Sequence, residues 1–240
     1  MSSDAYKLGY DAPTVGYMAH RTAQVHSAFF LPYLKPGWRV LDAGCGPGTI
    51  TLGLAQVVAP GKVTGIDLED AQFASGRAQA EREGLNVEFH KASAYELPFQ
   101  DGAFDAVFSH AMLEHLSTPA IALREFRRVL KPGGLIGVRS VDLGGLLIDA
   151  PPEAPAHALV AHVASALKDP NLGRKLGRLL WQAGFTVLKM TGSYEGIDQT
   201  RPSAVKPSAN PGEGGSNQAE SSDGPSFVAM AWVEAIGRAG

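Results

Sequence analysis

Three glycines at alternate positions separate a short β-rich run from an amphipathic segment, and this feature restricts the fold more than any other. The stretch Val40–Thr49 reads Val-Leu-Asp-Ala-Gly-Cys-Gly-Pro-Gly-Thr. The apolar residues that follow fall on one face of a helix: Ile50, Leu54, Val57 and Val58. Glycines at such a junction permit a sharp turn and let a ligand approach main-chain atoms at a helix N-terminus. The sequence therefore predicts a loop that holds a ligand against its backbone.

From Trp38 onward, short β-rich runs alternate with segments of helical periodicity. This alternation is typical of βαβ units, so we expect an α/β fold with a parallel sheet and helices on both faces. A second helical stripe, formed by Ala122, Phe126, Val129 and Leu130, stops at the turn Lys131–Gly134. The predicted strands are Trp38–Asp42, Val63–Asp67, Val87–His90, Phe104–Phe108 and Leu135–Val138.

The regions outside this core are less regular. Ala19–Leu34 is predicted to form a helix, preceded by a segment that contains Tyr6, Tyr10 and Tyr17, and this region is either a lid or an extra packing layer. Beyond the fifth strand we expect helices over His157–Leu167 and Leu172–Ala183, then β-like runs over Phe185–Met190 and Phe227–Val233. Pro, Gly, Ser, Asn and Ala dominate residues 200–226, which predicts a mobile connection or a loop that closes over substrate.

Composition excludes several classes of protein. The chain has 240 residues, 45% of them hydrophobic, which is enough for one ordinary core. Its net charge of −3 offers no basic surplus for a nucleic acid or an anionic membrane. Cys45 is the only cysteine, so an internal disulfide is excluded, and we find neither a signal peptide nor a membrane span. We expect a cytoplasmic protein, and the sequence does not predict its oligomeric state.

A nicotinamide dinucleotide is one candidate ligand, because its G-x-G-x-x-G fingerprint also lies between a first strand and a first helix. Gly44 and Gly46 match the first two glycines of this pattern, but Thr49 stands at the third. Asp42 ends the preceding strand, where its charge would repel a pyrophosphate. The pattern therefore favours a ligand that is cationic, or that donates hydrogen bonds, near Asp42.

A second carboxylate, Asp67, ends the next predicted strand. Its two oxygens can accept hydrogen bonds from both hydroxyls of a ribose. The alternative is that Asp67 only caps the helix that follows, but its pairing with the glycine loop favours a ligand contact. A nucleoside that also carries an ammonium group would satisfy both carboxylates.

Further motifs support this interpretation. In order along the chain, the matching stretches are Val40–Thr51, Thr64–Leu68, Ala92–Phe99, Phe104–Leu116 and Arg128–Gly134. On these stretches the sequence resembles the class I S-adenosylmethionine-dependent methyltransferases, and more closely their ubiquinone/menaquinone-biosynthesis-like branch of small-molecule enzymes. The family often has Gly-Asp where this chain has Ala92-Ser93, so a hydroxyl replaces the usual carboxylate contact to the adenine amino group.

The resemblance implies one methyltransferase domain over residues 1–240 with a Rossmann-like fold. We expect a mostly parallel seven-stranded sheet, helices on both faces and an antiparallel last strand. The expected divisions are an N-terminal helical lid (1–35), a cofactor-binding core (36–140), helices and a sixth strand (141–191), a flexible connection (192–226) and the last strand (227–240).

The resemblance also implies S-adenosyl-L-methionine as the cofactor. The glycine loop would face its methionine part, Asp42 would help to hold the ammonium, and Asp67 would bind the ribose. Leu68 and the loop at Ala94 and Tyr95 would border the adenine, with His110 near the sulfonium. The full set of expected cofactor contacts is Asp42, Gly44, Cys45, Gly46, Gly48, Asp67, Leu68, Ala94, Tyr95, His110 and Tyr17.

Methyl transfer from a sulfonium is an in-line displacement in which the departing sulfur needs no proton. Alignment of the reacting groups can contribute about 7–11 kcal/mol, and a base is required only for a hydroxyl, an ammonium or an acidic carbon. His110 and His115 are the best-placed bases, because they follow the fourth strand at the carboxyl edge of the sheet. The alternative is that His115 caps a short helix and Glu114 is solvated.

No metal site is predicted. His110 and His115 are five positions apart, as are His157 and His162, and on a helix this spacing turns the second side chain away by about 140°. Cys45 lacks a neighbouring base in sequence, so we interpret it as a small residue in the loop and not as a nucleophile.

The sequence therefore predicts an enzyme, an S-adenosylmethionine-dependent methyltransferase that acts on a small-molecule acceptor. Two alternatives remain open: an S-adenosylmethionine-binding protein with a regulatory or other non-methyl-transfer role, and a nicotinamide-dependent oxidoreductase.

Overall fold

A computed structural model describes residue 16 and residues 18–151, 155–196 and 227–240. Five strands form the parallel part of the sheet in the order β3-β2-β1-β4-β5. Their bounds are β1 Arg39–Ala43, β2 Lys62–Asp67, β3 Val87–Lys91, β4 Phe104–His110 and β5 Leu130–Val141. The order reverses between β1 and β4, and in open parallel sheets such a reversal creates a crevice at the carboxyl ends of the strands.

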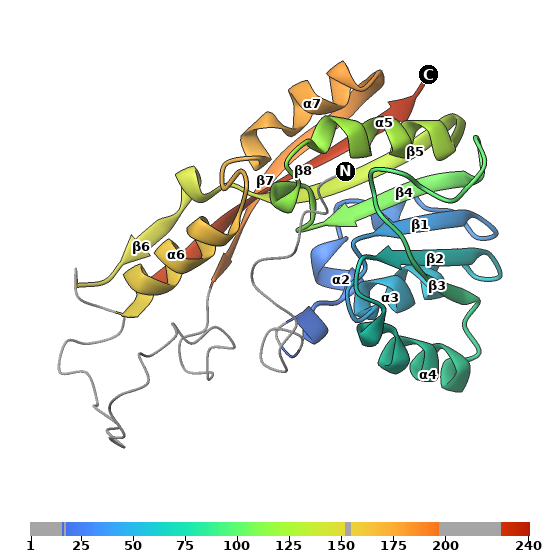
Figure 1. The fold of residues 1–240 in the computed structure, drawn as a ribbon, viewed down its shortest axis with the longest axis horizontal. Coiled ribbons are helices and arrows are strands. Elements are labelled where there is room, and N and C mark those ends of the chain that lie inside the picture. Colours follow the sequence, from blue (N-terminus) through green and yellow to red (C-terminus); the bar gives the residue numbers. More distant parts are fainter. Residues whose placement is uncertain (1–15, 17, 152–154, 197–226) are drawn as a thin grey trace.

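The remaining strands are antiparallel. β8 (Phe227–Ala239) lies between β5 and β7 (Phe185–Gly196), and the short β6 (Leu147–Asp149) pairs with the start of β8. In Figure 1 this end of the sheet, together with α6 (Pro155–Ala166), extends away from the parallel strands. The α/β fold with an antiparallel last strand is confirmed, with eight described strands where seven were expected. The additional strand, β6, has three residues and no clear alternation of apolar side chains in the sequence.

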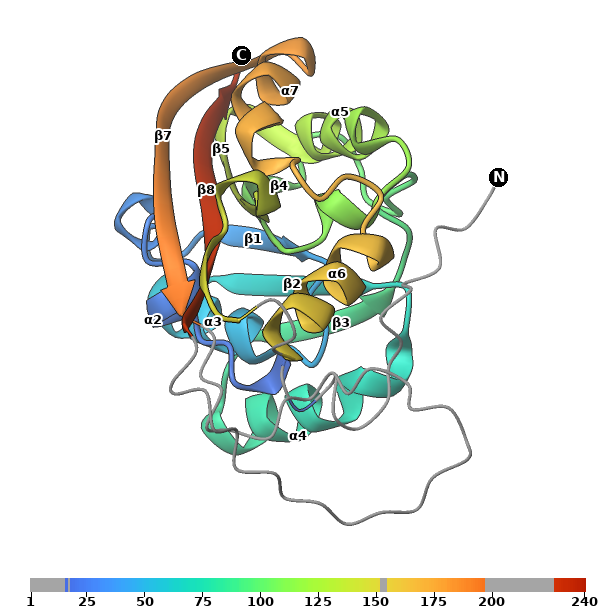
Figure 2. The same ribbon diagram turned by 90° about the vertical axis from the view of Figure 1, so that its left-hand side faces the viewer.

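Helices cover both faces of the sheet. α5 (Pro119–Val129) and α7 (Leu176–Gln182) pack on one face, where Leu123 and Phe126 contact a core that includes Leu41 and Val107. α3 (Thr49–Val58) covers the opposite face, with Leu54 packed among side chains such as Val40 and Phe108. α4 (Phe73–Glu83) lies beside β3 near the sheet edge, and Figure 2 shows these layers end on. The sequence analysis did not predict α4, because its few apolar residues form no clear stripe.

The continuous helix predicted over Ala19–Leu34 is wrong. The chain forms α2 (Ala23–His26) and then a separate 3₁₀ turn, η1 (Leu31–Tyr33). The Ser27 hydroxyl donates to Ala23 O, and Pro32 has no N–H to continue a helix. The interruption also brings Phe30, which is fully buried, against Gly137 of β5, where a Cβ atom would lie 2.5 Å from its ring.

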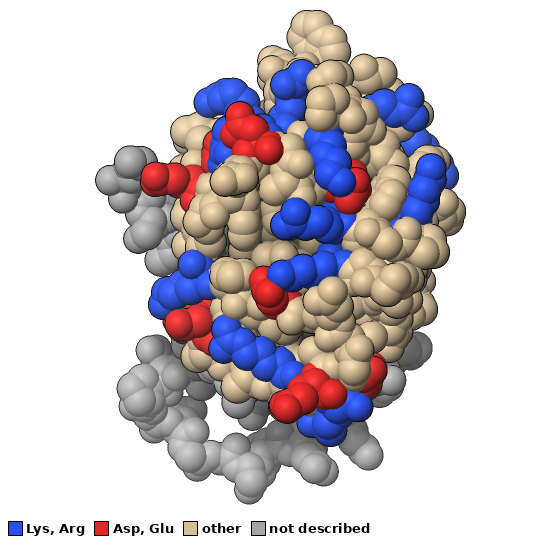
Figure 3. Space-filling view, turned by 90° about the vertical axis from the view of Figure 1, so that its right-hand side faces the viewer, with Lys and Arg blue, Asp and Glu red and all other residues tan. Residues whose placement is uncertain are grey.

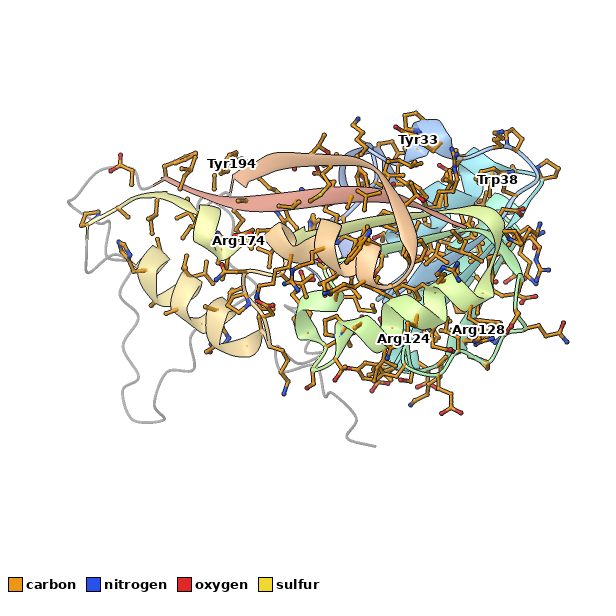
Figure 4. All side chains as sticks on the ribbon, turned by 90° about the horizontal axis from the view of Figure 1, so that it is seen from above. Tyr33, Trp38, Arg124, Arg128, Arg174 and Tyr194 are labelled. Carbon is orange, nitrogen blue, oxygen red and sulfur yellow. The ribbon has the colours of Figure 1, made fainter. Side chains whose placement is uncertain are left out.

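The C-terminal part also differs from expectation. β7 continues to Gly196, so the start of the predicted connection, residues 192–196, is strand. The side chains along β7 alternate between half-buried and exposed, and Tyr194 lies near its far end (Figure 4). The rest of that connection lies outside the described residues, as do Tyr6, Tyr10 and Tyr17.

Candidate functional site

The glycine loop lies at the carboxyl end of β1 and leads directly into α3. Gly44, Gly46 and Gly48 have φ angles of +76°, +53° and +87°, a region that L side chains rarely adopt. A Cβ atom on Gly44 would lie 2.7 Å from Met112 Cγ, and one on Gly48 would lie 2.6 Å from Phe89 Cζ. The loop therefore requires glycine for both its backbone conformation and its packing.

Asp42 is buried beneath this loop. Its Oδ2 accepts a hydrogen bond of 2.7 Å from Thr51 Oγ1, in the first turns of α3. Burial is the main cause that raises the pKa of Asp42, the bond from Thr51 opposes it, and the nearby charge of Asp67 adds to it, with a resulting pKa of about 7. A buried carboxylate is costly unless it is paired, so a cationic group of a ligand would suit a position beside an ionised Asp42.

Asp67 ends β2 on the other side of the loop. Its Oδ2 accepts from Gly46 N at 2.9 Å, and its Oδ1 accepts from Glu69 N at 3.3 Å. Burial raises the pKa of Asp67, and the bonds from Gly46 and Glu69 counteract that effect. The next residue, Leu68, is 38% exposed and offers an apolar surface beside the carboxylate.

Sequence reasoning missed three residues at this site. Met18 and Arg21, from the N-terminal segment, line a pocket together with Asp42, the glycine loop and His110. Gln72, after β2, is 7% exposed, and neither its Nε2 nor its Oε1 has a hydrogen-bond partner within the described structure. Gln72 Oε1 would lie 3.7 Å from a Cβ on Gly46, which places this unsatisfied amide over the loop. No residue pattern in the sequence connects Met18, Arg21 or Gln72 to the loop.

This pocket is narrow. Its volume is about 30 Å³, whereas sites for drug-sized ligands have roughly 300–1,000 Å³. Met18 and Arg21 are among its lining residues, and they come from a segment outside the sheet. A nucleoside-sized ligand would require part of this lining to move.

His110, the last residue of β4, is 5% exposed. Its Nε2 lies 3.0 Å from Arg139 Nη1, its ring stacks on Trp232 at 5.1 Å, and the edge of His26 lies 5.2 Å away. Burial, followed by the charges of Arg21 and Arg139, lowers the pKa of His110 well below its ordinary value. The ring is therefore neutral at neutral pH.

His115 and Glu114 belong to the 3₁₀ turn η3 (Leu113–His115). Burial and then the charge of Arg21 lower the pKa of His115 to about 4, so this residue is a weak base. Glu114 is 1% exposed, so the interpretation of this residue as solvated is wrong. Glu114 accepts from Ser140 Oγ at 3.0 Å and from Val141 N at 3.4 Å, which connects η3 to β5.

The other predicted contacts surround the same end of the sheet. Ala94 is buried and Tyr95 is half-buried, and Tyr95 Oη accepts from Thr118 N at 3.1 Å. Ser93 Oγ, at the position where the family often has Asp, accepts from Tyr95 N at 3.2 Å and holds the loop itself. Burial raises the pKa of the Cys45 thiol well above its ordinary value, so this cysteine stays protonated.

Within residues 18–151, 155–196 and 227–240, no group of three or more His, Cys, Asp or Glu side chains is arranged to hold a metal ion. None of the helices in the described part of the chain has the length and apolar character to cross a membrane.

Comparison with known proteins identifies the domain. Residues 40–134 match the family model described as a methyltransferase domain. An uncharacterized methyltransferase of Schizosaccharomyces pombe is 39% identical over 145 residues, which are 58% of this chain and 52% of that protein. A probable methyltransferase of Aspergillus luteorubrus, ltbC, is 39% identical over 144 residues, 56% of this chain and 50% of that protein. The chain thus spans about half the length of the curated relatives it matches.

Solved structures agree on the fold. A SAM-dependent methyltransferase from Aquifex aeolicus superposes with a TM-score of 0.61 at 18% identity, covering 97% of this chain and all of the other (100%). The [4+2]-cyclase SpnF superposes with a TM-score of 0.53 at 31% identity, covering 75% of this chain and 59% of the cyclase. These comparisons confirm the predicted fold, the resemblance to class I S-adenosylmethionine-dependent methyltransferases, and S-adenosylmethionine as the cofactor of that family.

Proposed function

We propose that this chain, which carries a class I S-adenosylmethionine-dependent methyltransferase domain, transfers a methyl group from S-adenosylmethionine to a small-molecule acceptor. The observation that carries the proposal is the pairing of opposite polar groups around the glycine loop. A buried carboxylate, Asp42, and a guanidinium, Arg21, line the same pocket. This pairing complements a ligand that presents an ammonium and a carboxylate together.

The polar side chains around the glycine loop match the polar groups of the cofactor. Asp42 suits the ammonium and Arg21 the carboxylate of the methionine part, because each offers the opposite charge. Asp67 accepts hydrogen bonds from two backbone N–H groups, and its oxygens have further lone pairs that can accept from ribose hydroxyls. The unsatisfied amide of Gln72 beside Gly46 supplies a donor and an acceptor that the protein itself leaves unused.

Entry of the cofactor requires displacement of the N-terminal segment. Met18 and Arg21 narrow the pocket, and they lie outside the sheet that fixes Asp42 and Asp67. We therefore assign residues 1–35 to a lid and residues 36–140 to the cofactor-binding core, with Tyr17 as a further lid residue. The acceptor would be held by the lid, by the segment after Val138 and by the C-terminal region.

When bound, S-adenosylmethionine supplies an electrophilic methyl group on a sulfonium. The protein's task is to orient the acceptor and exclude water, which can contribute about 7–11 kcal/mol. His110 is buried and lines the pocket, where it would contact the reacting groups, whereas His115, with a pKa of about 4, is too weak a base for efficient proton transfer at neutral pH. We infer that the acceptor reacts without a proton transfer to either histidine.

A small acceptor is favoured over a macromolecule. A demethylmenaquinone methyltransferase of Staphylococcus aureus is 39% identical over 105 residues. The face of the molecule in Figure 3 carries Lys and Arg interspersed with Asp and Glu, and the net charge is −3. A nucleic acid would need a continuous basic surface. We propose a cytoplasmic location, in keeping with a soluble small-molecule acceptor.

A second candidate function comes from one structural relative. SpnF, which is named a [4+2]-cyclase, is 31% identical over the matched region. A protein with this fold is therefore named for a reaction other than methyl transfer. The second candidate function is that this chain binds S-adenosylmethionine but has a role other than methyl transfer.

Incubation with S-adenosylmethionine labelled at its methyl group, together with a panel of quinols, phenols and amines, separates these functions. Label in a product supports methyl transfer. Tight binding of S-adenosylhomocysteine in a calorimetric titration, without label transfer to any acceptor, supports the second candidate. Binding of NAD without binding of S-adenosylhomocysteine would refute both.

A further inference from the structure

A row of polar side chains crosses four neighbouring strands beside the candidate site. His110 of β4 is the register partner of Arg139 of β5, Arg139 pairs with Glu234 of β8, and Glu234 pairs with Thr191 of β7. These strands lie side by side in the sheet (Figure 2). Because register partners project from the same face of a sheet, the four side chains form one continuous line.

Arg139 is the centre of this row and is 4% exposed. Its Nη1 lies 3.0 Å from His110 Nε2, its Nη2 donates to Glu195 Oε2 at 3.1 Å, and its Nε lies 3.4 Å from Glu234 Oε1. The guanidinium also lies over the ring of Trp232, 4.4 Å from its centroid. All three kinds of guanidinium nitrogen are therefore engaged by different partners.

The partners of Arg139 are themselves fixed. Glu234 accepts hydrogen bonds from Thr191 Oγ1 at 2.9 Å and from Ser193 Oγ. Glu195 contacts His26 at 3.5 Å as well as Arg139. With two carboxylates and an aromatic ring holding it, the guanidinium cannot rotate away from His110.

This arrangement decides which nitrogen of His110 carries the proton. A guanidinium has only donors, so the nitrogen that faces it must accept. A neutral imidazole has one acceptor and one donor, and with Nε2 accepting from Arg139 the proton must be on Nδ1. His110 Nδ1 is buried and has no hydrogen-bond partner within the described structure, and His110 lines the pocket with Asp42 and Gly44.

We propose that Arg139 is a positioning residue that fixes His110 as a hydrogen-bond donor, with its Nδ1–H available to a lone pair of the bound acceptor. The inference rests on the proposed function and narrows its substrate class to molecules with an oxygen next to the reacting atom, such as phenols, enols and ketones. An ammonium group has no lone pair for this donor. His110 binds and orients the acceptor and does not remove its proton: a phenol or enol loses that proton to solvent and reacts as the anion, a bond forms to the methyl carbon, and the methyl–sulfur bond breaks to leave S-adenosylhomocysteine.

The tautomer is measurable in the unmodified protein. Two-dimensional ¹H–¹⁵N spectra that correlate ring nitrogens with carbon-bound ring protons distinguish Nδ1–H, Nε2–H and doubly protonated histidine. We expect His110 at pH 7 in the Nδ1–H form, with exposed His90 as an internal reference. Either of the other two forms for His110 would overturn the proposal.

Arg139→Met tests whether Arg139 sets the tautomer of His110, with Arg174→Met as the matched control. Arg174 pairs with Asp142 and is exposed, and no contact joins it to His110 within the described residues. In Arg139→Met, His110 should leave the Nδ1–H form and methyl transfer should fall by about 10²-fold, as expected for a misplaced contact. Affinity for S-adenosylhomocysteine should change less than transfer, and Arg174→Met should change neither the tautomer nor the rate.

Several outcomes are decisive. An unchanged tautomer in folded Arg139→Met would show that Arg139 does not set it. If that variant does not fold, the spectrum of the unmodified protein alone decides the assignment. If the Nδ1–H form is present but no acceptor is ever methylated, the proposed function fails while the role of Arg139 stands. Preferential methylation of amines over phenols and enols would refute the substrate class.

Discussion

The pKa of Asp42 predicts that cofactor affinity depends on pH. In the free protein, burial raises this pKa to about 7, so the carboxyl group is half protonated near neutrality. An ammonium group beside Asp42 stabilises only the ionised form. Binding should therefore release a proton from Asp42, and affinity should rise as the pH increases through 7.

The size of this effect follows from the ionised fraction. For a pKa of about 7, roughly 9% of Asp42 is ionised at pH 6 and roughly 91% at pH 8. If only the ionised form binds the ammonium, the Kd of S-adenosylhomocysteine should fall about tenfold over this range, or about 1.4 kcal/mol. Near pH 7, binding should release about half a proton.

Calorimetric titration in two buffers of different ionisation enthalpy measures both quantities. Asp42→Asn is the matched variant, because it keeps an acceptor for Thr51 and removes the titrating group. It should bind more weakly and show a smaller pH dependence, since the ligand's own ionisation remains. Identical pH slopes for the two proteins would refute the assignment of Asp42 to the ammonium.

The raised pKa of Asp42 also affects the stability of the folded protein, which should fall with rising pH, whereas cofactor affinity should rise. Because the pKa of Asp42 is higher in the folded chain than the ordinary 3.8, the folded state binds more protons between about pH 4 and pH 7. The free energy of unfolding of the ligand-free protein should therefore fall as the pH rises through this window, and Asp42→Asn should lose this contribution. Denaturant titrations at pH 5 and pH 8 test the sign.

Four further substitutions test the site and its support. Asp67→Ala removes the proposed ribose acceptor and should weaken binding of S-adenosylhomocysteine by about 1.5–3 kcal/mol; an unchanged Kd would contradict its role. Gly48→Ala places a Cβ atom 2.6 Å from Phe89 Cζ at a φ of +87° and should lower the melting temperature. Gly84→Ala is also at positive φ, but its Cβ atom would have nothing within 4 Å, so it should lower the melting temperature less. Equal decreases in melting temperature would argue against an effect of the Phe89 contact. Phe30→Ala leaves a cavity against Gly137 and should cost about 3–5 kcal/mol of unfolding free energy, measured with denaturant; a loss below 1 kcal/mol would refute its place in the core.

The parallel core was predictable because its signals are local. The glycines of the first loop and the apolar spacing of α3 appear within Val40–Val58, and each strand of the parallel part carries its own β-rich run. The interruption between α2 and η1 has one local signal, Pro32, inside the predicted helix. The packing of Phe30 against Gly137, a residue more than a hundred positions away, has no local signal.

The candidate site also contains residues with local sequence signals and residues whose positions depend on distant parts of the chain. Asp42 and Asp67 end consecutive predicted strands, so their proximity followed from the fold class. Arg139 lies just beyond the predicted strand Leu135–Val138, and its contact with Glu234 depends on the register of β8 between β5 and β7. Arg21 reaches the pocket from an irregular segment, and Gln72, at the end of a 3₁₀ turn, lies near Gly46; sequence spacing gives neither side chain a direction.

The position of β8 has a consequence for the order in which the protein is made. β8 is the last strand in the sequence, yet it lies between β5 and β7. While the chain emerges from the ribosome, β7 therefore has no partner among the described strands until residues 227–239 are synthesised. Arg139 cannot contact Glu234 before then, so the parallel strands can pair early, whereas the antiparallel end of the sheet is completed only when β8 is inserted.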